Sequence, residues 1–212
     1  MGKKREKKYD KLLYIKTVGI REWAGRATHF NRYEATPYTA LDRLFKFYRF
    51  KKTDRVVDFG CGRGRVAFYI HNKFHIPVTG IEVNDKTYDE ALDNKWRYRQ
   101  RAKHIKAPIK LKFGFAEQYK VKSEDNKFYF FNPFSVKVFR RVINNILHSV
   151  EKEERPVDII LYYPMPEYKS LLMEETPFRL HNKIVVPEAT DEKEKFLIYR
   201  IETSDTVRDV SV

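Results

Sequence analysis

The sequence predicts an α/β fold with a mostly parallel sheet, and three patterns support this. Short apolar runs alternate with longer amphipathic segments over residues 37–174, as strands and helices do around a parallel sheet. A glycine-rich turn joins the first apolar run to the next segment. Near the C-terminus, 178–186 and 195–201 read as two strands around a polar loop, which predicts an antiparallel last strand.

Composition favours one main domain. The chain has 212 residues, of which 42% are hydrophobic, enough for a full core. We expect an N-terminal basic helix and candidate lid over 1–36, the α/β domain over 37–203 and a frayed tail over 204–212. No apolar run is long enough for a membrane span, and no signal peptide or disulfide pair is evident. These features predict a cytoplasmic protein.

The net charge is strongly positive. Forty-three Lys and Arg face 29 Asp and Glu, which gives +14 at pH 7. Such a surplus attracts polyanions, RNA above all. General solubility explains it equally well, so both interpretations remain open.

Residues 3–16 carry a net charge of +5 and read as a short amphipathic helix ending near Gly19. Tyr9, Leu12 and Leu13 supply its apolar spacing. This helix could dock on the domain, cover the active site or bind phosphates. For residues 1–8 we expect a solvated tail.

Residues 20–36 mix aromatic side chains with arginines and show no clear period. They could stack on bases or cover a core edge. We favour a lid that brings Tyr33 and Thr36 near a ligand. Thr36 and Pro37 read as the N-cap and first residue of a helix over 37–49.

The segment Asp54–Ile70 contains the main binding motif. A short apolar run, Val56-Val57, leads to Asp58, and Gly60, Gly62 and Gly64 follow before an apolar helical segment. Glycine permits positive φ and a close approach by a ligand. The N–H groups of a first helical turn have no partner inside the helix. Strand, glycine turn and helix therefore predict a ligand at the strand end.

A second strand within 76–84 ends at Glu82, where an acid can accept hydrogen bonds from ribose hydroxyls. Gly62, Gly64 and Ala67 also fit the dinucleotide pattern G-x-G-x-x-A. Asp58 argues against that alternative, because its charge would repel a diphosphate. A carboxylate there suits a ligand that carries positive charge.

The run Asp58-Phe59-Gly60-Cys61-Gly62-Arg63-Gly64 resembles the first motif of the class I S-adenosylmethionine-dependent methyltransferases, and Glu82 matches their ribose-binding acid. The resemblance implies a Rossmann-like seven-stranded sheet with helices on both faces, and S-adenosyl-L-methionine as cofactor. It also implies that Asp58 lies near the ammonium and sulfonium of that cofactor. The cofactor-binding residues we expect are Asp58, Gly60, Cys61, Gly62, Gly64, Glu82, Ala116, Glu117, Asn132, Tyr33 and Thr36. For Cys61 we expect a backbone N–H that meets the cofactor.

A third strand over 109–115 precedes Ala116 and Glu117. Members of the family carry an acid after this strand that reaches the adenine amino group, commonly an Asp directly before a small residue. Here that slot holds Phe115. Either Glu117 takes the role from a shifted position, or adenine is held by backbone groups and by stacking on Phe115.

A fourth strand, 127–132, leads into Asn132-Pro133-Phe134-Ser135. This run resembles, in part, the N-P-P-Y motif of amino-group methyltransferases. The resemblance implies that Asn132 and the Pro133 carbonyl accept hydrogens of a target amine while Phe134 stacks on the target. An Asn-Pro turn before a helix capped by Ser135 is the alternative. A fifth strand, 157–163, ends in Tyr162 and Tyr163 near the substrate face, and a short helix follows over 166–174.

The helix over 85–103, capped by Asn84, has a basic end. Eight Lys and Arg and no acid occur from Lys95 to Lys112. We interpret them as a candidate phosphate-contacting patch, with a hydrated helix face as the alternative.

We therefore expect an S-adenosylmethionine-dependent methyltransferase whose acceptor is an amino group on RNA or protein. The alternatives are a non-catalytic module that binds RNA or a partner, and an NAD-dependent oxidoreductase. The six histidines show no zinc-site spacing, so we expect no metal. The sequence leaves the oligomeric state open.

Overall fold

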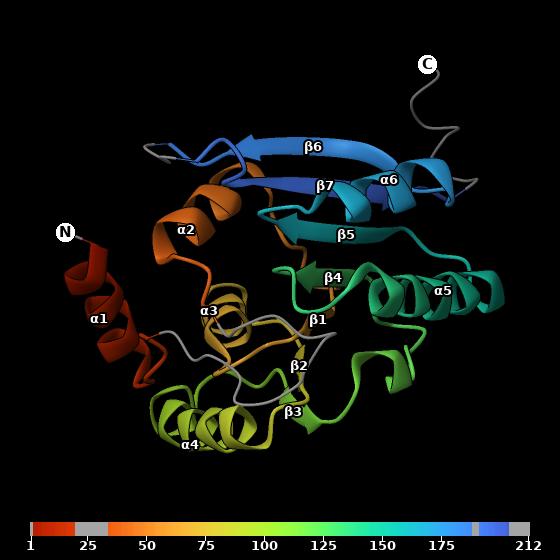
Figure 1. Cartoon of the computed structure of the whole chain (residues 1–212). Coiled ribbons are helices and arrows are strands. Elements are labelled where there is room, and N and C mark those ends of the chain that lie inside the picture. The colour runs from red at the N-terminus through yellow and green to blue at the C-terminus, as the bar shows by residue number, and fades with distance from the viewer. Residues whose placement is uncertain (1, 20–33, 188–190, 204–212) are drawn as a thin grey trace.

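A computed structural model describes residues 2–19, 34–187 and 191–203 (Figure 1). Its centre is a seven-stranded sheet in the order β3-β2-β1-β4-β5-β7-β6. The strands are β1 Val56–Phe59, β2 Val78–Glu82, β3 Ile109–Phe113, β4 Lys127–Phe130, β5 Val157–Tyr162, β6 Arg179–Val185 and β7 Lys195–Ile201. The helices are α1 Gly2–Leu13, α2 Tyr38–Phe47, α3 Arg65–Phe74, α4 Asp85–Arg101, α5 Val136–Lys152 and α6 Pro166–Glu174, and one 3-10 turn, η1, spans Ala116–Gln118.

The sheet is parallel from β3 to β5, and β7 runs antiparallel to both of its neighbours, β5 and β6. The expected architecture is confirmed, including the antiparallel last strand. The chain order reverses between β1 and β4, since β1 pairs with β2 on one side and with β4 on the other. In open α/β sheets ligands bind at such a switch point, beyond the carboxyl ends of the strands.

Helices cover both faces of the sheet. Val56 packs in one core layer, which includes Leu44 of α2, Phe68 of α3 and Ala91 of α4. The adjacent Val57 points the other way, into the layer formed with α5 and α6. This alternation is the period-two geometry of a strand. Because both faces are buried, the central strands read as continuous apolar runs.

The N-terminal helix α1 docks on the domain. The buried carboxylate of Asp10 accepts hydrogen bonds from the Thr17 amide at 2.5 Å and from the Tyr38 hydroxyl at 2.8 Å. The Tyr9 ring stacks on Tyr38 with centroids 4.7 Å apart. Among the possibilities left open for this segment, docking is therefore the observed one. Basic side chains of α1, including Lys7 and Lys8, stay exposed to solvent.

Two local predictions are wrong. The helix α1 begins at Gly2, so residues 2–8 are helical and not a solvated tail. Thr36 does not cap α2, which begins at Tyr38 with Pro37 at the N-cap. The Thr36 hydroxyl instead forms a 2.8 Å hydrogen bond with the Tyr129 hydroxyl. The Tyr38 amide donates to Glu6 of α1 at 3.2 Å, so a carboxylate distant in sequence takes the capping role.

Candidate functional site

The glycine loop between β1 and α3 lies against the chain that follows β4. Gly60 has φ of +71°, and a Cβ placed on it would lie 2.3 Å from the Pro133 Cβ. Real atoms do not approach so closely, so only glycine fits at this position. The glycine motif and the Asn132-Pro133-Phe134-Ser135 motif therefore meet in space at Gly60 and Pro133.

The backbone amides of the glycine loop are engaged within the protein. The N–H groups of Gly60 and Cys61 donate to the Ile81 carbonyl at 2.9 Å, and that of Gly64 donates to the Cys61 carbonyl at 2.8 Å. This arrangement corrects the expectation that the Cys61 N–H meets a ligand. A diphosphate site depends on amides that point at the anion. The loop offers no such group at these three positions.

Asp58 is a buried acidic side chain within β1. Its side chain is 3% exposed, and its Oδ2 atom has no hydrogen-bond partner among the described residues. Burial, and then the nearby Glu82 carboxylate, raise the pKa of Asp58 to about 8. An unpaired buried carboxylate is costly to ionise. A positively charged ligand beside it would remove that cost.

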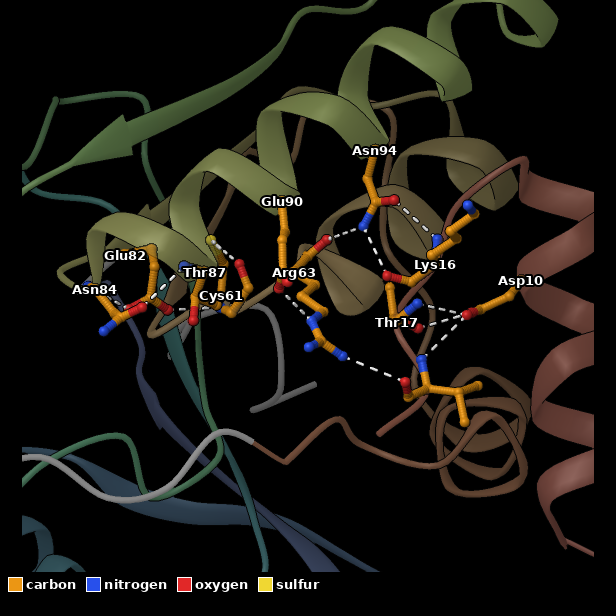
Figure 2. Close-up of polar contacts among 12 residues, drawn as sticks. Asp10, Lys16, Thr17, Cys61, Arg63, Glu82, Asn84, Thr87, Glu90 and Asn94 are labelled. Carbon is orange, nitrogen blue, oxygen red and sulfur yellow. Dashed lines mark hydrogen bonds and ion pairs between the residues drawn. The ribbon is translucent and has the colours of Figure 1, made fainter. Parts of the chain in front are cut away.

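Glu82, at the end of β2, holds the glycine loop in place (Figure 2). One carboxylate oxygen accepts from the Gly62 amide at 2.9 Å, and the other accepts from Val83 at 2.9 Å and from Asn84 at 2.8 Å. Burial raises the pKa of Glu82, and these three amides oppose the increase. The carboxylate therefore orients the loop whether or not it also binds a ribose.

The glycine loop is also clamped by residues that the sequence analysis did not single out. The fully buried Asn94 of α4 donates to the carbonyls of Arg63 at 3.0 Å and Lys16 at 3.1 Å. The Arg63 guanidinium pairs with Glu90 at 2.6 Å (Figure 2). The only sign of this clamp in the sequence was a polar Asn within the expected helix over 85–103. Its hydrogen-bond partners become adjacent only on folding.

One cavity contains Asp58, and a second cavity adjoins it. A narrow one is lined by Asp58, Gly60, Thr36 and Tyr129, among others. A larger one, of about 390 Å³, is lined by Glu34, Pro37, Phe131, Asn132, Tyr162, Tyr163 and Glu194. Both cavities share Glu34 and Phe131, so the larger one adjoins the surroundings of Asp58.

Asn132 and Tyr163 meet at the carboxyl ends of β4 and β5. Both have positive φ, +41° and +50°, which is unusual for residues other than glycine. The Asn132 Nδ2 donates to the Tyr163 carbonyl at 2.5 Å, so the Oδ1 end of the amide points away from that carbonyl. Strained backbone of this kind clusters at functional sites. Tyr162 and Tyr163, which we expect near the substrate face, both line the larger cavity.

Phe134 does not take the expected position. Its side chain is 2% exposed and packs in the core, with its ring edge-on to Phe130 at 6.2 Å. Its carbonyl accepts from the Tyr168 hydroxyl at 2.5 Å. The ring cannot stack on an acceptor from there, so this prediction is wrong. Phe131, Tyr162 and Tyr163 supply the rings at the cavity instead.

Ala116 and Glu117 do not line the narrow cavity that contains Asp58. Ala116 is buried in the core, and Glu117 lines a separate cavity of about 520 Å³ beside α5. A Glu117 oxygen lies 3.8 Å from the Arg141 guanidinium of α5. The structure therefore does not bring Glu117 together with Asp58 and Glu82. Phe115 is 45% exposed.

The two residues of the expected lid differ in what is known of them. Tyr33, like the rest of 20–33, lies outside the described residues. Thr36 is buried and lines the narrow cavity, and its carbonyl accepts from Arg65 at 3.1 Å. The expected tail over 204–212 also lies outside the described residues.

The basic patch Lys95–Lys112 extends toward the opposite end of the sheet. The helix α4 starts beyond the carboxyl end of β2 and runs back to the amino end of β3. Pro108, just before β3, accepts a hydrogen bond from Val78 at the start of β2. The residues from Arg99 to Lys106 therefore lie far from Asn132. Arg101 also covers the Tyr14 ring at 4.6 Å.

Within residues 2–19, 34–187 and 191–203, no group of three or more His, Cys, Asp or Glu is arranged to hold a metal ion. No helix in the same part of the chain has the length and apolar character that a membrane span requires.

Sheet order, helix layers and loop positions together define a Rossmann-like methyltransferase fold. The structure of a putative RNA methyltransferase, PH1948 from Pyrococcus horikoshii, has a TM-score of 0.55 and 16% identity, over 94% of this chain and 98% of that one. The tRNA (uracil-54, C5)-methyltransferase of Pyrococcus abyssi, crystallised with S-adenosyl-L-homocysteine, has a TM-score of 0.53 and 12% identity, over 77% of this chain and 38% of that one. At these identities the likeness is one of fold.

One curated methyltransferase matches part of the sequence. The chain is 33% identical over 63 residues to a protein-lysine N-methyltransferase of Saccharolobus islandicus. The match spans 29% of this chain and 39% of that protein's length. No protein-family model matches the chain.

Proposed function

We propose that the protein is an S-adenosylmethionine-dependent methyltransferase that methylates an amino group. The observation that carries the proposal is Asp58, a buried carboxylate with an unpartnered oxygen, in the described part of the chain, beside a loop whose amides are already engaged. That environment favours a cationic ligand over a diphosphate. The methyltransferase fold and the partial sequence match support the same class.

The residues present fit this cofactor. Asp58 would face its cationic end and Glu82 its ribose hydroxyls, with the loop of Gly60, Gly62 and Gly64 beside it. Phe115 would stack on the adenine, and Tyr33 and Thr36 would lie near the cofactor. S-adenosylmethionine supplies a methyl group attached to a positively charged sulfur, which is a good leaving group.

The chain itself has to align and desolvate the acceptor. The Nδ2 atom of Asn132 donates to the Tyr163 carbonyl, and in the proposed complex its Oδ1 atom would accept a hydrogen from the amine. The Pro133 carbonyl, in the segment that packs on Gly60, would accept a second hydrogen. Two acceptors would direct the nitrogen lone pair toward the methyl group.

Two observations bear on the molecule that carries the amino group. The net charge of +14 supports a polyanion such as RNA. The partial relative is a protein-lysine N-methyltransferase, which supports a protein acceptor.

Calorimetric titration of S-adenosylmethionine, S-adenosylhomocysteine and NAD into the protein tests the proposal. We expect binding of the first two and none of NAD. Asp58→Asn should weaken S-adenosylmethionine binding at least tenfold, whereas Asp93→Asn, an exposed position on α4, should leave it unchanged. Binding of NAD alone would favour an oxidoreductase, and binding of none of the three would favour a non-catalytic module.

A further inference from the structure

We propose that the larger cavity takes a primary aliphatic amine in its ammonium form, such as a lysine side chain, as the methyl acceptor. This inference rests on the proposed function and specifies its substrate class. The amine would enter between the carboxyl ends of β4 and β5 and the Glu34–Pro37 segment, and its nitrogen would reach Asn132.

The walls of the cavity are aromatic and suit methylene groups that end in a cation. The rings of Phe131 and Tyr162 pack edge to face with centroids 4.7 Å apart. The Tyr163 ring lies 6.4 Å from that of Phe131 and 6.5 Å from that of Tyr162. Ring faces attract ammonium groups, and ring surfaces remove alkyl chains from water.

Both ionised side chains in the cavity lining are carboxylates, although the chain as a whole is basic. Glu34 and Glu194 line it, and the Tyr162 hydroxyl donates to Glu194 at 2.7 Å. The Tyr163 hydroxyl donates to a further carboxylate, that of Asp191, which lies outside the cavity lining. Local negative charge favours an ammonium group and disfavours a phosphate-bearing chain. The two lining carboxylates therefore differ in sign from the net charge of the chain.

The cavity also lies where an acceptor must lie. It shares Glu34 and Phe131 with the narrow cavity that contains Asp58. The Asp58 Oδ2 atom has no hydrogen-bond partner in the described chain, which independently indicates a cationic ligand in that adjoining cavity. Pro133, which follows Asn132 of the larger cavity, packs on Gly60 of the narrow one. Asn132 stands at the wall of the larger cavity, so the acceptor nitrogen and the donor site would share a border.

The reaction balances with these groups alone and the proposed cofactor. The ammonium gives one proton to the Glu194 carboxylate and becomes a neutral amine. The amine nitrogen then bonds to the methyl carbon while the carbon–sulfur bond breaks and sulfur keeps the electron pair. The product is a protonated secondary amine and S-adenosylhomocysteine. Glu194 returns its proton to water.

Ligand binding tests the inference separately from catalysis. We would titrate n-pentylamine, and its uncharged counterpart 1-pentanol, into the protein and follow chemical shifts, first alone and then with saturating S-adenosylhomocysteine. We expect pentylamine to bind at least tenfold more tightly than pentanol. Glu194→Gln should weaken pentylamine binding about tenfold, the loss expected for one hydrogen bond to a charged group, and leave pentanol binding unchanged. Glu192→Gln, an exposed neighbour outside the cavity lining, is the matched control.

Transfer of an isotopically labelled methyl group identifies the source of the amine. A lysine-containing peptide, spermidine and an RNA oligonucleotide would be offered in parallel and analysed by mass spectrometry. Label in the peptide or in spermidine supports the inference and says whether the amine belongs to a protein or to a free polyamine. Label in the RNA alone, equal binding of amine and alcohol, or equal effects of Glu194→Gln and Glu192→Gln would overturn it. Because amine binding is measured without cofactor, absence of S-adenosylmethionine binding would reject the proposed function and leave a separate result for the cavity.

Discussion

The Gly62 amide donates a 2.9 Å hydrogen bond to Glu82, the acid at the end of the neighbouring strand. The residue that the sequence marks as a ribose ligand thus also fixes the glycine loop against β2. Its three backbone hydrogen bonds are all buried or partly buried, where an unsatisfied amide is expensive. If Glu82 binds the ribose as proposed, one carboxylate would couple the shape of the loop to ligand binding.

Replacing Glu82 should affect both stability and binding. Glu82→Ala leaves the amides of Gly62, Val83 and Asn84 without their acceptor, so we expect a loss of about 2–4 kcal/mol in the free energy of unfolding. Glu90→Ala is the matched control, because that carboxylate is 37% exposed and its ion pair with Arg63 should contribute about 1 kcal/mol or less. Urea unfolding measures both. Equal losses, or unchanged S-adenosylmethionine binding by Glu82→Ala, would contradict the role assigned to Glu82.

The contact of Gly60 with Pro133 predicts a specific intolerance. Gly60→Ala should destabilise the protein by about 2–4 kcal/mol, because the new methyl group overlaps Pro133 and φ is positive. Gly114→Ala separates the two causes, since Gly114 also has positive φ but no atom lies within 4 Å of the position that an added methyl group would occupy. We expect only about 1 kcal/mol there. Thermal unfolding with matched urea curves makes the comparison, and a Gly60→Ala variant as stable as Gly114→Ala would show that Gly60 and Pro133 are not in contact.

The buried Asp58 predicts that the stability of the ligand-free protein falls as pH rises. The pKa of Asp58 is about 8 in the fold, against an ordinary value of 3.8. A raised pKa means that the folded protein holds the proton more tightly than the unfolded chain. The contribution is therefore fully present below about pH 4 and is lost as pH rises through about 8, by up to about 1.4 kcal/mol per pH unit.

The Asp58→Asn variant isolates this effect from other titrating groups. Asparagine has nearly the same shape and no charge, so the variant should gain stability over the parent progressively between about pH 4 and 8. The measurement is the difference between the two free energies of unfolding at about pH 5, 6.5 and 8.5. Parallel pH profiles would mean that Asp58 titrates normally.

The same carboxyl group predicts proton release on cofactor binding. A cationic ligand favours ionised Asp58, so binding of S-adenosylmethionine below about pH 8 should expel a proton and strengthen as pH rises from about 6 to 7.5. Calorimetry in buffers of different ionisation enthalpy measures the released proton. Binding without proton exchange at about pH 6.5 would show that the cofactor leaves Asp58 protonated.

The central α/β pattern of the fold follows from local signals. Val56 and Val57 indicate a buried strand because the sheet is covered on both faces. The buried side chains of α5, which include Val138, Val142 and Ile146, recur at helical spacing. Asn84 caps α4 as expected, since its side chain accepts from the Thr87 amide at 2.8 Å. The local sequence pattern gave a wrong prediction at Thr36. The Tyr38 amide, which an N-cap side chain would have accepted from, donates instead to Glu6 of α1.

The sequence by itself determined the placing of the chemical groups along the first two strands: a carboxylate, a glycine turn and a second acid at successive strand ends, because residue spacing within a βαβ unit is a local property. Only the tertiary structure decided that Phe134 belongs to the core, that Glu117 faces α5, and that Phe131, Tyr163 and Glu194 surround one cavity. Those last three residues come from segments far apart along the chain. Burial and charge at such a site depend on which distant segments pack together, and no local pattern encodes that.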